Sequence, residues 1–114
     1  MTKAQVATRA LQALGVLYAG QSASAEDQDI AEATVQTVYD LLRAKPGLPF
    51  AITAVQEWAQ LALAHIAAQE MAPAFGVTGE RFAAVAALAG IGRQTINEQM
   101  QAKHHVLAPG PDYY

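Results

Sequence analysis

The sequence predicts an all-α fold, a small bundle of about four helices followed by an extended C-terminal arm. Its 114 residues suit one domain, 53% of them are hydrophobic and only 7% are aromatic. Alanine, the commonest residue, costs no side-chain entropy in a helix, whereas the β-branched and aromatic residues of strands are sparse. Because an alanine buries only about one methyl group, we expect a thin core that another chain helps to cover.

The first helix is expected to begin after Thr2, which can serve as its N-cap, and to end at Gly15. Residues 16–20 then form an apolar connector between two glycines, expected to be buried beneath the helices. Ser24 predicts the start of a second helix, with Asp27 at the third position as in a capping box and further acids in the first turns. The residues predicted to face inward are Ile30, Thr34, Val38, Leu41 and Leu42, and Pro46-Gly47 ends the helix.

A third helix is expected to begin at Pro49, because proline suits a first helical turn, and to end near Met71. Its apolar stripe comprises Ile52, Val55, Ala59, Ala62 and Ile66, widened by Trp58 and Leu61. A fourth helix follows Thr78 and runs to about Lys103. Its predicted seam consists of Phe82, Val85, Ala89, Gly92, Ile96 and Lys103, and small residues at 86, 87, 89, 90 and 92 allow a neighbouring backbone to come close.

The chain therefore divides into a helical domain over residues 1–103 and an arm over 104–114, which has two prolines and no helical period. Short proline-containing ends commonly fray. Here, however, apolar and tyrosine side chains are costly to leave in water, and tyrosine suits partner contacts. We therefore expect the arm to bind a partner through Val106, Leu107, Pro109, Pro111, Tyr113 and Tyr114.

Charge and cysteine content exclude several classes of function. The formal net charge is -3 and charged residues make up 15% of the chain, which disfavours a broad polyanion-binding face. The chain has no cysteine and thus no disulfide, thiolate metal site or cysteine nucleophile. The start of the chain has no apolar signal segment, and the apolar stretch 82–91 is about half of a membrane span, so a soluble protein with a mature cytoplasmic start is expected.

The sequence predicts no catalytic, cofactor-binding or metal-binding residues, and hence no enzyme. His104 and His105 are adjacent, so on a helix they diverge by about 100° and cannot chelate one metal, while His65 has no partners at ligand spacing. The acids between residues 26 and 32 are explained by the helix dipole. No phosphate-binding glycine loop or nucleophile elbow is present.

An alternative function is DNA binding. Ala72, Gly76, Val77, Thr78 and Phe82 have the spacing of a helix-turn-helix, with the turn at Gly76-Val77-Thr78. Two features weaken this interpretation: Pro73 lies where the first helix of the motif should continue, and the recognition helix offers only Glu80 and Arg81 before an apolar run.

Residues 9–27, which read RALQALGVLYAGQSASAED, resemble the opening of the head-to-tail adaptor proteins of tailed bacteriophages. The resemblance continues in Leu48-Pro49, in Leu63-Ala64 and in residues 72–77 (APAFGV), and covers about Lys3 to Lys103. These motifs are helix caps and turns, and the arm after Lys103 matches no motif of the family.

The resemblance implies a structural virion protein: a helical adaptor present in twelve copies as a ring beneath the portal protein. Such a ring extends the DNA channel, lets genomic DNA pass without reading its sequence, and offers a platform for the next tail or neck protein. The protein would be made in the host bacterial cytoplasm and reside in the neck of the virion. The family commonly latches onto the portal with extended terminal segments. The oligomeric state of the free protein and the helix that lines the channel stay open.

Overall fold

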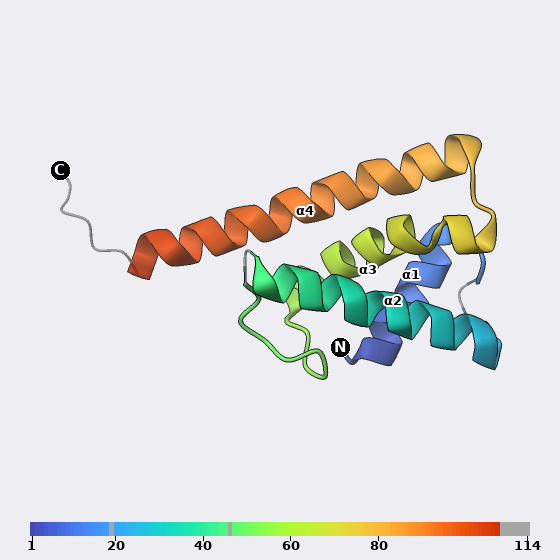
Figure 1. The fold of residues 1–114 in the computed structure, drawn as a ribbon, viewed down its shortest axis with the longest axis horizontal. Helices are drawn as coiled ribbons and strands as arrows, with labels where there is room; N and C mark the ends of the chain where they lie inside the picture. The colour runs from blue at the N-terminus through green and yellow to red at the C-terminus, as the bar shows by residue number, and fades with distance from the viewer. Residues whose placement is uncertain (19, 46, 108–114) are drawn as a thin grey trace.

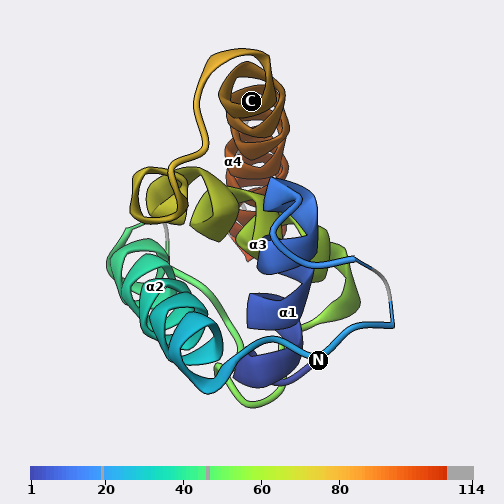
Figure 2. The same ribbon diagram turned by 90° about the vertical axis from the view of Figure 1, so that its right-hand side faces the viewer.

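The computed structural model describes residues 1–18, 20–45 and 47–107, with the backbone alone for 102–107. It confirms the predicted all-α fold. Four α-helices and one short 3-10 helix follow one another, and the described residues contain no strand. Figure 1 shows α4 along one side of the bundle, and in Figure 2 α3 lies between α4 and the pair α1 and α2.

The first helix, α1 (Lys3–Leu14), has both predicted ends. The Thr2 hydroxyl accepts the Gln5 N–H, and the Gln5 side chain accepts the Thr2 N–H, which completes a capping box. Gly15 ends the helix at φ 80°, a left-handed conformation that favours glycine, and its N–H donates to the Gln12 carbonyl at 3.0 Å. In the connector that follows, Leu17 is buried as expected, whereas Tyr18 is 72% exposed.

The second helix, α2 (Ala25–Ala44), begins as predicted, with the Ser24 hydroxyl accepting the Asp27 N–H at 3.2 Å. Its buried residues are Ala31, Val35, Val38 and Tyr39. The prediction that Ile30 and Leu41 face inward is wrong, since their side chains are 41% and 64% exposed. The helix is instead rotated so that Tyr39 packs on Phe50, with ring centroids 6.2 Å apart. Pro46 lies outside the described residues.

The third helix, α3 (Glu57–Met71), ends where expected but begins eight residues after Pro49, which therefore does not open it. Residues 48–56 form a loop whose Leu48, Phe50 and Val55 side chains are buried. The backbones of Val55 and Met1 bond to each other in both directions, at 2.9 and 3.2 Å, so tertiary contacts hold this segment outside the helix.

Within the bundle α3 is the central helix and contacts α1, α2 and α4. Eight of its residues are buried: Ala59, Ala62, Leu63, Ala64, Ile66, Ala67, Ala68 and Met71. Ten of the 26 buried apolar side chains of the described chain are alanines, so the core is as thin as the composition predicts. Trp58 is only half-buried, with its ring edge-on to Phe50 at 5.9 Å, and Leu61 is 48% exposed.

The 3-10 helix η1 (Pro73–Phe75) and Gly76, at φ 68°, turn the chain into α4 (Gly79–Leu107). The fourth helix starts directly after Thr78, as predicted, but continues four residues beyond Lys103. The backbone of His104–Leu107 is therefore helical, and the helix and arm do not meet at the expected boundary. Physically, no glycine or proline interrupts the chain between Gly92 and Pro109.

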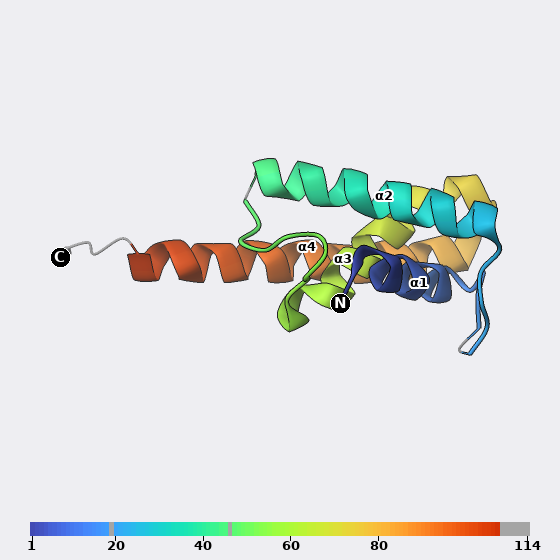
Figure 3. The same ribbon diagram turned by 90° about the horizontal axis from the view of Figure 1, so that it is seen from below.

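The predicted seam of α4 packs on α3 from Val85 to Ile96, and the side chain of its last residue, Lys103, is not among those that the structure describes. Val85, Ala89, Gly92 and Ile96 are buried, and Phe82 lies at the edge, partly exposed. Figures 1 and 3 show the two helices side by side and running in opposite directions. The small residue at Gly92 lies directly against the backbone of Ala62, as the small-residue pattern predicts.

Candidate partner-binding surfaces

The predicted partner-binding residues fall at and beyond the end of α4. Val106 and Leu107 belong to the last turn of that helix, where only the backbone is described, and Pro109, Pro111, Tyr113 and Tyr114 lie outside the described residues. Among the side chains that the structure describes, Met100 is the last buried one of α4. The final turns extend past the other three helices (Figure 3), so the helix carries the start of the arm away from the core.

The outer face of α4 is apolar in its first half. Residues 82–92 contain no polar side chain, yet α4 packs mainly on α3 and makes few contacts with α1. Leu88 and Ile91 are 39% and 60% exposed, and Ala84 beside them is also exposed. A helix that is apolar on all sides is typical of a buried position. This face therefore has the composition of a contact surface, and no partner covers it within the described part of the chain.

A second apolar surface runs along the outside of α2. Ile30, Ala33, Thr37 and Leu41 follow one another at helical spacing and are all exposed. The Thr37 hydroxyl donates to the Ala33 carbonyl of its own helix at 3.0 Å, so it needs no outside partner. Sequence reasoning assigned two of these residues to the core, and the missed signal was that α2 has apolar residues on more than one face.

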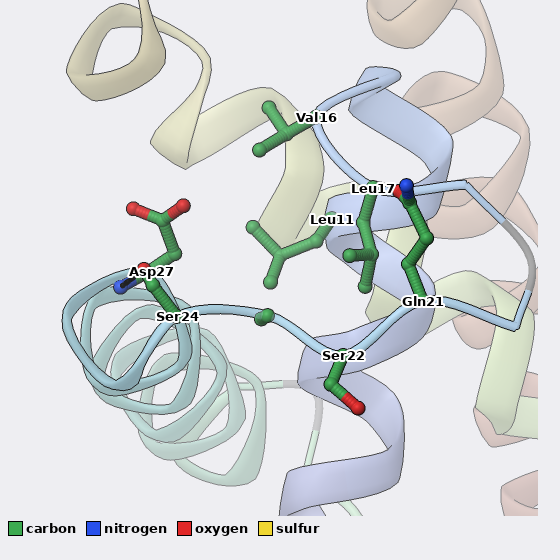
Figure 4. A pocket seen from close by; sticks show the side chains of 8 residues that line it. Leu11, Val16, Leu17, Gln21, Ser22, Ser24 and Asp27 are labelled. Atoms are coloured by element: carbon green, nitrogen blue, oxygen red, sulfur yellow. Dashed lines mark hydrogen bonds between the residues drawn. The ribbon is translucent and has the colours of Figure 1, made fainter.

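A hollow of about 370 Å³ lies between the end of α1, the following loop and the start of α2. Figure 4 shows Leu11, Leu17 and Val16 around it, with Ser24 and Asp27 on the α2 side. The Ser24 hydroxyl caps α2, and the Gln21 side chain accepts the Tyr18 N–H at 2.9 Å. The Ser24 and Gln21 side chains are thus engaged in hydrogen bonds with nearby backbone N–H groups.

A second hollow, of about 510 Å³, lies beside the end of α2 and the loop that follows it. Its lining includes Tyr39, Asp40, Arg43 and Phe50. The Tyr39 hydroxyl donates to the Phe50 carbonyl, which fixes the loop to the helix. The acidic and basic side chains that line this hollow form no ion pair with each other, and we assign no function to it.

His65 on α3 is half-buried, and its surroundings disfavour a positive charge. Burial lowers the pKa of its imidazole below the ordinary value, and the nearby Arg9 guanidinium lowers it further. Among the described residues, no three histidine, cysteine, aspartate or glutamate side chains gather closely enough to hold a metal ion.

The segment that suggested a helix-turn-helix joins two helices that lie alongside each other. In that motif the two helices cross at about 90–120°, whereas α3 and α4 run antiparallel along their shared length (Figures 1 and 3). The Arg81 guanidinium lies over Gly15, where a Cβ on the glycine would meet its Cζ at 3.0 Å. Arg81 thus sits at the carbonyl end of α1, a favourable place for a positive charge.

None of the helices in the described part of the chain has the length and apolarity needed to cross a membrane. Comparisons of the chain with protein-family models, with curated proteins and with solved structures find no match.

Proposed function

We propose that this protein is a structural virion protein, a head-to-tail adaptor that forms a ring beneath the portal, extends the DNA channel and provides the attachment platform for the tail. The observation that carries the proposal is the unpartnered apolar face of α4, where Leu88 and Ile91 are exposed within a run that has no polar side chain. The kind of assembly that we propose, a ring bound to the portal, comes from the resemblance of residues 3–103 to the adaptor family.

The proposal accounts for three features together. A core with many alanines leaves a protomer whose stability benefits from neighbours. Two separate apolar helix faces give it surfaces for those neighbours. The long α4 ends away from the core, and the segment assigned to the portal begins in its last turn, with Val106 and Leu107, and continues into the sequence that contains Tyr113 and Tyr114.

The portal contact is tested with two truncations. Deleting residues 108–114 removes the tail and keeps α4 whole, whereas deleting residues 104–114 also removes its last turn. Both variants should keep the far-ultraviolet circular dichroism of the helical domain and bind portal rings more weakly than the full chain. Unchanged affinity in both would exclude the arm as the portal-binding segment.

The alternative, a DNA-binding module that uses the Gly76-Val77-Thr78 turn, is distinguished by Arg81→Ala. A sequence-reading module should lose tight duplex binding in this variant. The adaptor should show only weak, salt-sensitive binding, with the same salt dependence before and after the substitution.

A further inference from the structure

Two exposed apolar stripes on different helices have matching dimensions. The α2 stripe consists of Ile30, Ala33, Thr37 and Leu41, and the α4 stripe consists of Ala84, Leu88, Ile91 and Thr95, the last of which is half-buried. Each spans three helical turns, about 16 Å at 1.5 Å per residue. The hydroxyl of Thr95 donates to the Ile91 carbonyl at 2.9 Å, as Thr37 does to Ala33. Both stripes are therefore free of unpaired side-chain polar groups.

Within one chain the two stripes cannot meet. The helices α2 and α4 each pack on α3 and make no contact with each other in the described structure. Figure 2 shows them on different sides of the central helix. Any partner that joins them must therefore be a separate molecule.

The sizes of the side chains favour contact between unlike stripes. On α2 the large residues, Ile30 and Leu41, are at the two ends, with the small Ala33 and Thr37 between them. On α4 the order is reversed, with Leu88 and Ile91 in the middle and Ala84 and Thr95 at the ends. When the α2 stripe lies on the α4 stripe, every large residue faces a small one, which is how packed layers interdigitate. Pairing a stripe with its own copy would set large residues against large ones.

The helix dipoles favour an antiparallel direction of the pairing. In an antiparallel arrangement Leu41 faces Ala84, which brings Lys45 opposite Glu80 and Asp27 opposite Glu98. In a parallel arrangement Glu26 faces Glu80, a repulsive pair, and Asp27 faces Arg81, an attractive pair, so each direction combines attraction with repulsion. Lys45 and Glu80 are both exposed, so the attractive pair of the antiparallel arrangement is available to a neighbour.

We propose that the α2 stripe of one copy binds the α4 stripe of the next copy, antiparallel, in a head-to-tail contact. Because the two surfaces differ, each copy keeps one free stripe, and the assembly grows until it closes into a ring or continues as a filament. The contact itself rests on the surfaces described above, and only its closure into a portal-bound ring rests on the proposed function.

A complementation experiment tests the contact with the full chain. Leu41→Glu places a charge in the α2 stripe and Ile91→Glu places one in the α4 stripe, both at side chains that are more than half exposed. Leu61→Glu, on α3 and outside both stripes, is the matched control. Masses are measured by sedimentation velocity over a range of concentrations, and the fold by circular dichroism.

The wild-type chain and Leu61→Glu should form species larger than a dimer, while Leu41→Glu and Ile91→Glu should each be monomers. Mixed in equal amounts, the last two should form a dimer, because each retains the stripe that the other lacks. Three results would overturn the proposal: a monomeric wild type at the highest concentration, equal loss of association in Leu61→Glu, or a single variant that still dimerises and whose mass does not increase on mixing.

The contact and the adaptor function can fail separately. If the two variants complement each other but the wild-type chain does not bind portal rings, the adaptor function is contradicted and the contact between copies is retained.

The direction is tested by disulfide formation, since the chain has no cysteine of its own. A Leu41→Cys chain mixed with an Ala84→Cys chain should cross-link under mild oxidation. Preferential cross-linking of Leu41→Cys with Thr95→Cys would show the parallel arrangement and overturn the antiparallel one.

Discussion

Gly92 of α4 faces the backbone of Ala62 of α3 so closely that a Cβ on residue 92 would lie 3.0 Å from both the Cα and the carbonyl oxygen of Ala62. Real Cβ atoms rarely come this near to backbone, and backbone cannot swing aside as a side chain can. The glycine therefore sets how closely α3 and α4 pack.

Gly92→Ala should lower the free energy of unfolding by about 1–3 kcal/mol, the usual cost of overpacking. Gly90→Ala, two residues away, is the matched control because a Cβ there meets nothing within 4 Å. That substitution should stabilise the protein by about 0.5–1 kcal/mol through helix propensity. Urea unfolding of both variants measures the difference, and equal effects of the two would contradict the close packing.

Tyr39 holds the loop 48–56 against α2 through its hydroxyl, which donates to the Phe50 carbonyl. Tyr39→Phe keeps the ring contact but leaves that buried carbonyl without its donor, so we expect a loss of about 1–3 kcal/mol in the free energy of unfolding. Tyr18→Phe, at a side chain that is 72% exposed, should change it by less than about 0.5 kcal/mol. No difference between the two variants would argue against the bond.

Two leucines on α3 separate the core from the surface. Leu63 is fully buried, and Leu63→Ala should lower the free energy of unfolding by about 2–5 kcal/mol. Leu61 lies two residues earlier and is 48% exposed. Leu61→Ala should therefore lower the free energy of unfolding by at most about 1 kcal/mol. Thermal or urea unfolding checks the order, and the reverse order would mean that α3 is rotated about its axis.

His65 should make the fold less stable in mild acid. Its pKa is lower in the folded protein than in the unfolded chain, because burial and Arg9 disfavour its charged form. As the pH falls through the ordinary histidine value of about 6.5, the unfolded chain takes up the proton first, so this group's contribution to the free energy of unfolding decreases until the pH has passed the lower folded pKa. The His65→Gln variant should show a flatter decline between neutral pH and mild acid. An unchanged pH profile in that variant would assign the decline to other groups.

The ends of α1 and the start of α2 could be predicted because their signals are local. Thr2, Gly15 and Ser24 act through bonds to backbone groups a few residues away. The start of α3 could not be predicted in the same way. A proline permits a first helical turn without requiring one, and contacts of Phe50 and Val55 with residues distant in the chain hold the loop outside the helix.

The partner-binding surfaces were harder to predict for a related reason. Ile30 and Leu41 have ordinary core composition, and the face of α2 that turns inward is decided by tertiary packing, in which Ala31, Val35 and Val38 are buried and Tyr39 lies against Phe50. On α4 the apolar run was visible in the sequence, but its exposure depends on the absence of a second intramolecular partner helix in the described structure. The assignment of Val106 to Tyr114 to the portal stays a prediction.

The most direct test of the adaptor function is the light-scattering mass of portal rings with and without this protein. The proposed function predicts that saturated rings gain the mass of twelve chains of 12.0 kDa each, and that the chain with residues 104–114 deleted adds less at the same concentration. Portal rings whose mass stays unchanged at saturating concentrations of the full chain would contradict the account.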